Sequence, residues 1–196
     1  TRLTGIVGLR PGRVVLPAPG GVERVHMGTQ FKFEHTYRAP SVAALLKAYW
    51  DADHNASQDK LSQLTDRVVV EDATTEGVRK TVWKVASTRP IPLIAKPFVE
   101  HGRLTFLETM IRRSDSLIES SVVPQILKGR VHIDASYQLA QVGDHQVTRT
   151  YAGTITAGMP LIGGKIERGI LEAFDKEMPV MTKCTQDWLD RTFPTG

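Results

Sequence analysis

The sequence predicts an α+β fold in which an antiparallel sheet packs against one long C-terminal helix. A long stretch of strand-like sequence precedes an amphipathic helical pattern that begins at a Gly-rich turn. Short turns separate the strand-like segments, and a parallel pair would need a crossover connection of a dozen or more residues. Neighbouring strands are therefore expected to be antiparallel.

The first strand is predicted from residue 30 to residue 37, where large side chains alternate with polar ones. One face of this strand carries Phe31, Phe33, His35 and Tyr37. Ser41 then caps a first short helix, and residues 51–55 break its pattern. We expect a second short helix from Ser57 to Leu64.

Six further strands follow in the same alternating pattern, separated by turn-like residues. They are expected at residues 67–72, 78–87, 104–112, 117–123, 131–140 and 146–157. The apolar segment 90–98 contains three prolines, which excludes an interior strand. We expect this segment to form an exposed or packed loop, which is a candidate lid.

A Gly-rich turn at residues 161–164 leads into the long helix, which is expected from Ile166 to Phe193 and carries one apolar stripe at steps of three and four residues. The stripe consists of Ile166, Ile170, Phe174, Met178, Met181, Thr185 and Trp188. The opposite face, expected to meet water, carries Lys165, Glu167, Arg168, Glu172, Asp175, Lys176, Lys183, Asp187 and Asp190. Pro179 should bend the helix near Glu177.

The composition, with 41% hydrophobic and 23% charged residues, is that of an ordinary globular domain. We expect one domain from residue 29 to residue 196, preceded by an irregular extension at residues 1–28. This extension is rich in Gly, Pro and Arg, so an irregular surface arm and a processed organellar targeting sequence both fit it. The compartment, cytoplasm or organellar matrix, stays open.

Several classes of function find no support. No apolar run reaches the roughly 20 residues that span a bilayer. The net charge of +4 resides mostly in residues 1–30, which carry four arginines against one glutamate, so no basic stripe predicts nucleic-acid binding. The six histidines are dispersed and Cys184 is the only cysteine, so we predict no disulfide, no metal site and no cofactor.

The order of elements, together with the motif from Met159 to Glu167 (Met-Pro-Leu-Ile-Gly-Gly-Lys-Ile-Glu), resembles the START-like superfamily, also called SRPBCC or Bet v 1-like. The resemblance covers residues 29–193 and is strongest to an uncharacterised bacterial-type branch. It implies a helix-grip fold, in which a curved seven-stranded antiparallel sheet wraps the C-terminal helix around an apolar tunnel. Superfamily members bind lipids, sterols, hormones, quinones or polyketides there, and a minority are enzymes.

If this tunnel exists, inward-facing aromatic, apolar and charged side chains would bind a ligand in it. These candidates are His35, Tyr37, Trp83, Phe106, Glu108, Tyr137, Arg149, Tyr151, Ile170 and Phe174. The expected gate consists of Ile91, Leu93, Phe98, Gly163 and Gly164. Glu108 and Arg149 could form a structural ion pair or anchor a polar ligand head, and His35 could be a core histidine or a general base.

The function favoured by these observations is non-enzymatic binding, or transport, of a hydrophobic lipid-like small molecule. Two alternatives stay open. In the first, the domain is a structural subunit whose residues 1–28 lie across partner proteins. In the second, it is a polyketide cyclase or dehydratase that uses an inward acid or base, for which Glu108 and His35 are the candidates. No catalytic residue is assigned.

Overall fold

The computed structural model describes residues 28–89, 103–125 and 129–194. In chain order the elements are β1 (Thr29–Arg38), α1 (Val42–Ala48), α2 (Ala52–Ser62), β2 (Leu64–Thr75), β3 (Val78–Ser87), β4 (Leu104–Arg112), β5 (Leu117–Pro124), β6 (Val131–Gly143), β7 (Gln146–Ala157) and α3 (Gly163–Thr192). The predicted order of one strand, two helices, six strands and a long helix is confirmed. Most of the N-terminal extension and the lid residues Ile91, Leu93 and Phe98 lie outside the described residues.

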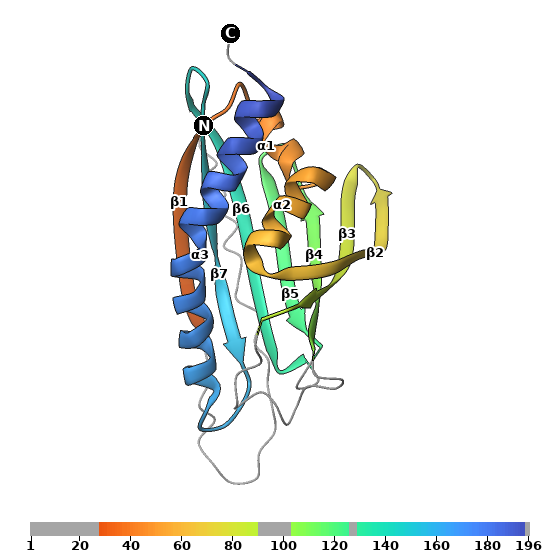
Figure 1. The fold of residues 1–196 in the computed structure, drawn as a ribbon, viewed down its shortest axis with the longest axis vertical. Helices are drawn as coiled ribbons and strands as arrows, with labels where there is room; N and C mark the ends of the chain where they lie inside the picture. The colour runs from red at the N-terminus through yellow and green to blue at the C-terminus, as the bar shows by residue number, and fades with distance from the viewer. Residues whose placement is uncertain (1–27, 90–102, 126–128, 195–196) are drawn as a thin grey trace, which may run out of the picture.

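The strands form one seven-stranded antiparallel sheet in the order β1-β7-β6-β5-β4-β3-β2. β1 pairs with β7 along its full length, so the first and last strands are neighbours. Figure 1 shows α3 lying lengthwise over the β1 and β7 side of the curved sheet, with α1 and α2 over its middle. This arrangement confirms the predicted helix-grip fold.

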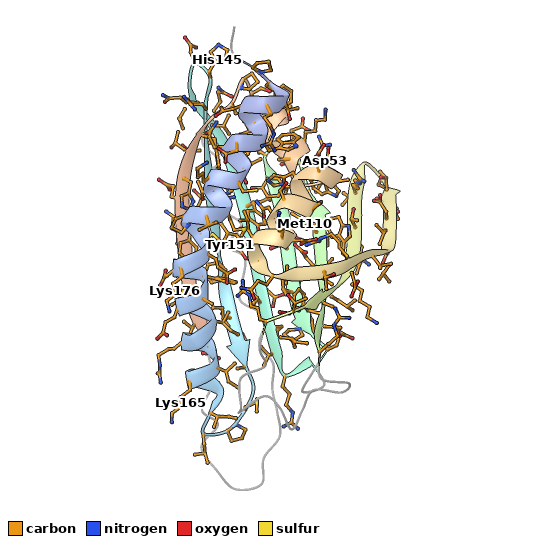
Figure 2. The ribbon with its side chains drawn as sticks, in the orientation of Figure 1. Asp53, Met110, His145, Tyr151, Lys165 and Lys176 are labelled. Atoms are coloured by element: carbon orange, nitrogen blue, oxygen red, sulfur yellow. The ribbon has the colours of Figure 1, made fainter. Side chains whose placement is uncertain are left out.

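α3 is one helix of 30 residues that continues through Pro179. Its predicted apolar stripe is buried or half-buried against the sheet, whereas the exposed Lys165 and Lys176 project outward in Figure 2. Burying such a stripe contributes roughly 1.5–3 kcal/mol for each fully buried large apolar side chain. Among the helices of the described ranges, none is long and apolar enough to cross a membrane.

Glu167 corrects the prediction for the outer face of α3, because this side chain is only 2% exposed. Its Oε1 accepts a hydrogen bond from the Ala157 backbone N–H at 2.8 Å, and its Oε2 accepts one from the Thr29 hydroxyl at 2.8 Å. The spacing of apolar residues along the helix predicts only which side chains face the sheet, so it could not predict that the polar Glu167 is buried. The first turns of α3 also pack against the ends of β7 and β1, and Glu167 ties these three elements together.

α2 begins at Ala52, earlier than predicted, because residues 52–55 are helical and do not interrupt the helical pattern. Asp51 is the N-cap, and its Oδ1 accepts a hydrogen bond from the His54 backbone N–H at 2.9 Å. The helix ends at Gln63 in the left-handed conformation, so β2 starts at Leu64. The helix has no apolar stripe, and its buried residues are the polar His54 and Asp59. Apolar periodicity therefore could not locate it.

The interior contains two hydrophobic clusters. The larger lies between the sheet, α1 and the end of α3, and its fully buried members include Tyr37, Leu45, Val85, Ile118 and Leu189. The second consists of Phe31, Ile133, Tyr151 and Ile155, with half-buried Ile170 and Phe174 from α3 packed against it. Tyr137 packs against both clusters. Tyr137 therefore marks the place where the two clusters meet.

Candidate functional site

A cavity of about 80 Å³ lies between α2, α3 and the inner face of the sheet. Its wall combines aromatic, polar, charged and methionine side chains: Tyr49, His54, Asn55, Gln58, Arg67, Glu108, Met110, Tyr137, Arg149, Met178 and Met181. Met110, which is labelled in Figure 2, lies near the middle of the long axis of the molecule. The cavity is smaller than the roughly 300–1,000 Å³ of a pocket that encloses a drug-sized ligand.

Arg149 is the most deeply buried charge on this wall, with 4% of its surface exposed. It reaches inward from β7, and its Nη2 donates to His35 Nδ1 at 3.3 Å and to the Thr182 hydroxyl at 3.3 Å. The guanidinium lies 5.2 Å from the ring centre of Tyr37 and 6.0 Å from that of Tyr137. Within the described ranges, no carboxylate forms an ion pair with it.

Several buried polar atoms around Arg149 lack a hydrogen-bond partner in the described part of the chain. They are Arg149 Nε, the hydroxyls of Tyr37 and Tyr49, and His54 Nδ1. Burial raises the pKa of Tyr49, an effect that the nearby Arg149 cation partly offsets. The phenol therefore keeps its proton and is a hydrogen-bond donor. An unpartnered buried donor costs about 1–3 kcal/mol, which a water or a ligand at the cavity would recover.

The other guanidinium on the wall, Arg67, is fully paired. Its Nε and Nη2 donate to the two carboxylate oxygens of Asp59, each at 2.7 Å, and its Nη1 donates to Glu108 Oε2 at 2.7 Å. Glu108 is therefore paired with Arg67, and the alternative of a structural ion pair between Glu108 and Arg149 is wrong. A bulge in β2 between Thr65 and Val68 turns Arg67 inward, and strand alternation gives no sign of such a bulge.

His54 joins α2 to α3 beside the cavity. Its Nε2 lies 3.0 Å from the Thr185 hydroxyl and 3.1 Å from Gln58 Nε2. Burial lowers the pKa of His54 to about 4, so the imidazole is neutral near pH 7. Trp188 Nε1 adds a second connection between the helices by donating to Asp51 Oδ1 at 3.0 Å.

Of the predicted ligand-binding residues, the structure brings Glu108, Tyr137 and Arg149 together on the cavity wall. His35 lies next to Arg149 but is not part of the wall. The others pack in the two clusters: Tyr37, Trp83 and Phe106 in the larger, and Tyr151, Ile170 and Phe174 in the second. Tyr151 stacks on Tyr137, with ring centres 4.4 Å apart.

The two glycines of the expected gate differ. Gly163 is buried, and a Cβ on it would collide with the Ala157 carbonyl oxygen. A Cβ on Gly164 would meet no atom within 4 Å. Gly163 thus permits the close approach of α3 to the end of β7.

The sequence prediction missed most of the α2 side of the wall. The missed residues are Tyr49, His54, Asn55, Gln58 and Arg67. The spacing of His54 and Gln58, four residues apart on one helix face, was the available signal. Met178 and Met181 belong to the predicted apolar stripe of α3, but neither these two residues nor Met110 were among the predicted ligand-binding residues.

Neither acid–base candidate is free. Glu108 accepts from Arg67, and His35 accepts from Arg149. Burial and the Arg149 cation lower the pKa of His35, which keeps its ring neutral. Cys184 is buried, and burial raises the pKa of its thiol. Within the described ranges, no group of three metal-binding side chains occurs.

Residues 32–189, most of the chain, match the family described as "Protein of unknown function (DUF2505)". The chain belongs to this family. No curated protein matches this DUF2505 chain.

Solved structures relate the DUF2505 chain to the START-like superfamily by fold. The protein TTHA0849 from Thermus thermophilus has a TM-score of 0.56 and 11% identity over 84% of this chain and 99% of its own. A START superfamily protein from Mycobacterium smegmatis has a TM-score of 0.54 and 7% identity over 83% and 98%. The Zhui aromatase/cyclase from Streptomyces sp. R1128 has a TM-score of 0.53 and 11% identity over 83% and 94%. The predicted resemblance to START-like proteins is confirmed at the level of fold, which by itself does not assign a ligand.

Proposed function

We propose that the protein binds a hydrophobic, lipid-like small molecule between the sheet and α3, without transforming it. The observation that carries this proposal is the cavity between α2, α3 and the sheet, where the unpartnered Arg149 Nε and Tyr49 hydroxyl are buried. Buried polar groups without partners are rare in proteins, and a ligand site is one reason to keep them. The START-like fold supports the same function by analogy.

The size of the cavity requires that the wall adapts to a ligand with an apolar tail. Met110, Met178 and Met181 line the cavity, and methionine is unbranched and fits irregular spaces easily. Tyr137 connects this wall to the second cluster, where Ile170 and Phe174 from α3 are only half-buried. We propose that the tail displaces the methionines and lies along this aromatic cluster.

The contacts of the acid–base candidates favour binding over catalysis. The Glu108 carboxylate is bonded to Arg67, and the neutral ring of His35 accepts from Arg149 beside the cavity. A general base needs access to a substrate proton at hydrogen-bond distance. These contacts support a role for both side chains in positioning their neighbours.

Native mass spectrometry and solvent extraction of the purified protein test this proposal. The wild type should carry a hydrophobic adduct, and Met178→Trp should lose it because the indole fills the cavity. Val180→Trp is the matched control, since Val180 is exposed on the same helix and the substitution leaves the cavity unchanged. The proposal is wrong if the wild type carries no adduct and binds no amphiphile, or if both variants retain the adduct equally.

A further inference from the structure

Two arginines on the same cavity wall differ in their partners. Arg67 forms three hydrogen bonds of 2.7 Å with two carboxylates, whereas Arg149, which is buried more deeply, has only neutral partners. Aromatic rings at 5.2 and 6.0 Å compensate part of the desolvation of Arg149. A buried cation is normally paired with an anion. Across residues 28–89, 103–125 and 129–194, no side chain supplies one for Arg149.

We propose that Arg149 and Tyr49 bind the carboxylate head of the ligand at the polar end of the cavity. This inference rests on the function proposed above and adds the chemical class of the ligand. Arg149 Nε and the Tyr49 hydroxyl are buried donors that form no hydrogen bond of normal geometry, the two side chains are neighbours, and both residues line the cavity. A carboxylate has two oxygens that each accept hydrogen bonds, so one head group can satisfy both donors.

The cavity has room for such a head group but not for a long tail. A cavity of roughly 10–15 Å³, measured in the same way, holds one water molecule, so the two oxygens of a carboxylate need roughly 20–30 Å³. The cavity volume of about 80 Å³ therefore accommodates the head. The apolar tail would occupy the space opened by the methionines.

The other charges at the cavity restrict the head to a single negative charge. Glu108 lies on the same wall and repels an anion, although Arg67 balances part of its charge. Asp59 is bonded to the far side of Arg67, and His54 is neutral. A doubly charged phosphate would meet stronger repulsion than a carboxylate.

Calorimetric titration of decanoate and decanamide into the full chain at pH 7.5 tests the inference, because the two probes differ mainly in charge. The wild type should bind decanoate at least about tenfold more tightly than decanamide, the effect of charge-assisted hydrogen bonds. Arg149→Met should remove this preference and leave decanamide affinity within about threefold. Glu108→Gln should strengthen decanoate binding relative to decanamide binding, because it removes a negative charge from the wall.

Tyr49→Phe keeps the test decisive if Arg149→Met does not fold. It removes a hydroxyl that has no partner, so the thermal midpoint should stay the same or rise while decanoate affinity falls severalfold. Equal binding of both probes by the wild type, or unchanged decanoate affinity in Tyr49→Phe and Glu108→Gln, overturns the carboxylate site and leaves the cavity function standing. Binding of neither probe overturns the cavity function itself.

Discussion

At the scale of single residues, surroundings decide what a buried charge does. Strand alternation predicts that Arg149 and Tyr151 share one face of their strand, and both side chains are buried. The same reasoning could not identify the partner of Glu108, because Arg67 reaches it through a bulge. The alternation of a strand predicts which side chains point inward. The partner of a buried charge depends in addition on local irregularities of the backbone, such as this bulge.

His54 makes stability depend on pH. Its folded pKa of about 4 lies below the ordinary value of 6.5, so the unfolded chain binds a proton that the folded chain does not. The free energy of unfolding should therefore fall as pH drops from 6.5 to 4, by up to about 1.4 kcal/mol per pH unit from this group. Denaturant titrations across this range should show a weaker dependence for His54→Gln.

The control for this prediction is His145→Asn, which removes an exposed histidine and tolerates the left-handed backbone at that position. Its pH dependence should match that of the wild type. Parallel pH profiles for His54→Gln and the wild type would show that His54 is not the group responsible.

Glu167 should contribute measurably to stability, because its carboxylate accepts hydrogen bonds from Ala157 and Thr29 in a buried position. Glu167→Ala leaves the Ala157 N–H without this acceptor and should lower the free energy of unfolding by about 1–3 kcal/mol. Glu172→Ala, at an exposed position of the same helix, should change it by less than about 0.5 kcal/mol. Similar losses in the two variants would contradict the anchoring role.

At the scale of elements, the beginning of α3 depends on one of two adjacent glycines. The carbonyl of Ala157 approaches Gly163 so closely that a side chain would collide with backbone, which cannot move aside cheaply. Gly164 faces open space. If this turn were a hinge, both glycines would be needed for backbone flexibility. If it is a packing contact, only Gly163 is needed, because only Gly163 lies against the backbone of Ala157.

Gly163→Ala should destabilise the protein by about 1–3 kcal/mol, the usual effect of overpacking. Gly164→Ala should be neutral or stabilise by up to about 1 kcal/mol, because alanine favours the helix. Thermal unfolding of the two variants provides the comparison. Equal destabilisation by both would indicate a hinge instead of a packing contact.

At the scale of the whole molecule, local patterns and the resemblance predicted different parts of the structure. Alternation and turns located the strands, and β3, β4 and β7 have the predicted bounds. The pairing of β1 with β7 joins the first and last strands, which are far apart in the sequence, so local patterns could not predict it. His54, Asn55 and Gln58 of the cavity wall were missed because α2 has no apolar stripe and buries polar side chains.

A crystal structure of the wild type with decanoate would show whether the cavity between α2, α3 and the sheet binds the head of a hydrophobic carboxylate. We expect ordered carboxylate density with an oxygen within hydrogen-bond distance of Arg149, about 3 Å, and the tail beside Met178. A cavity that holds only water, with decanoate elsewhere or absent, would contradict it.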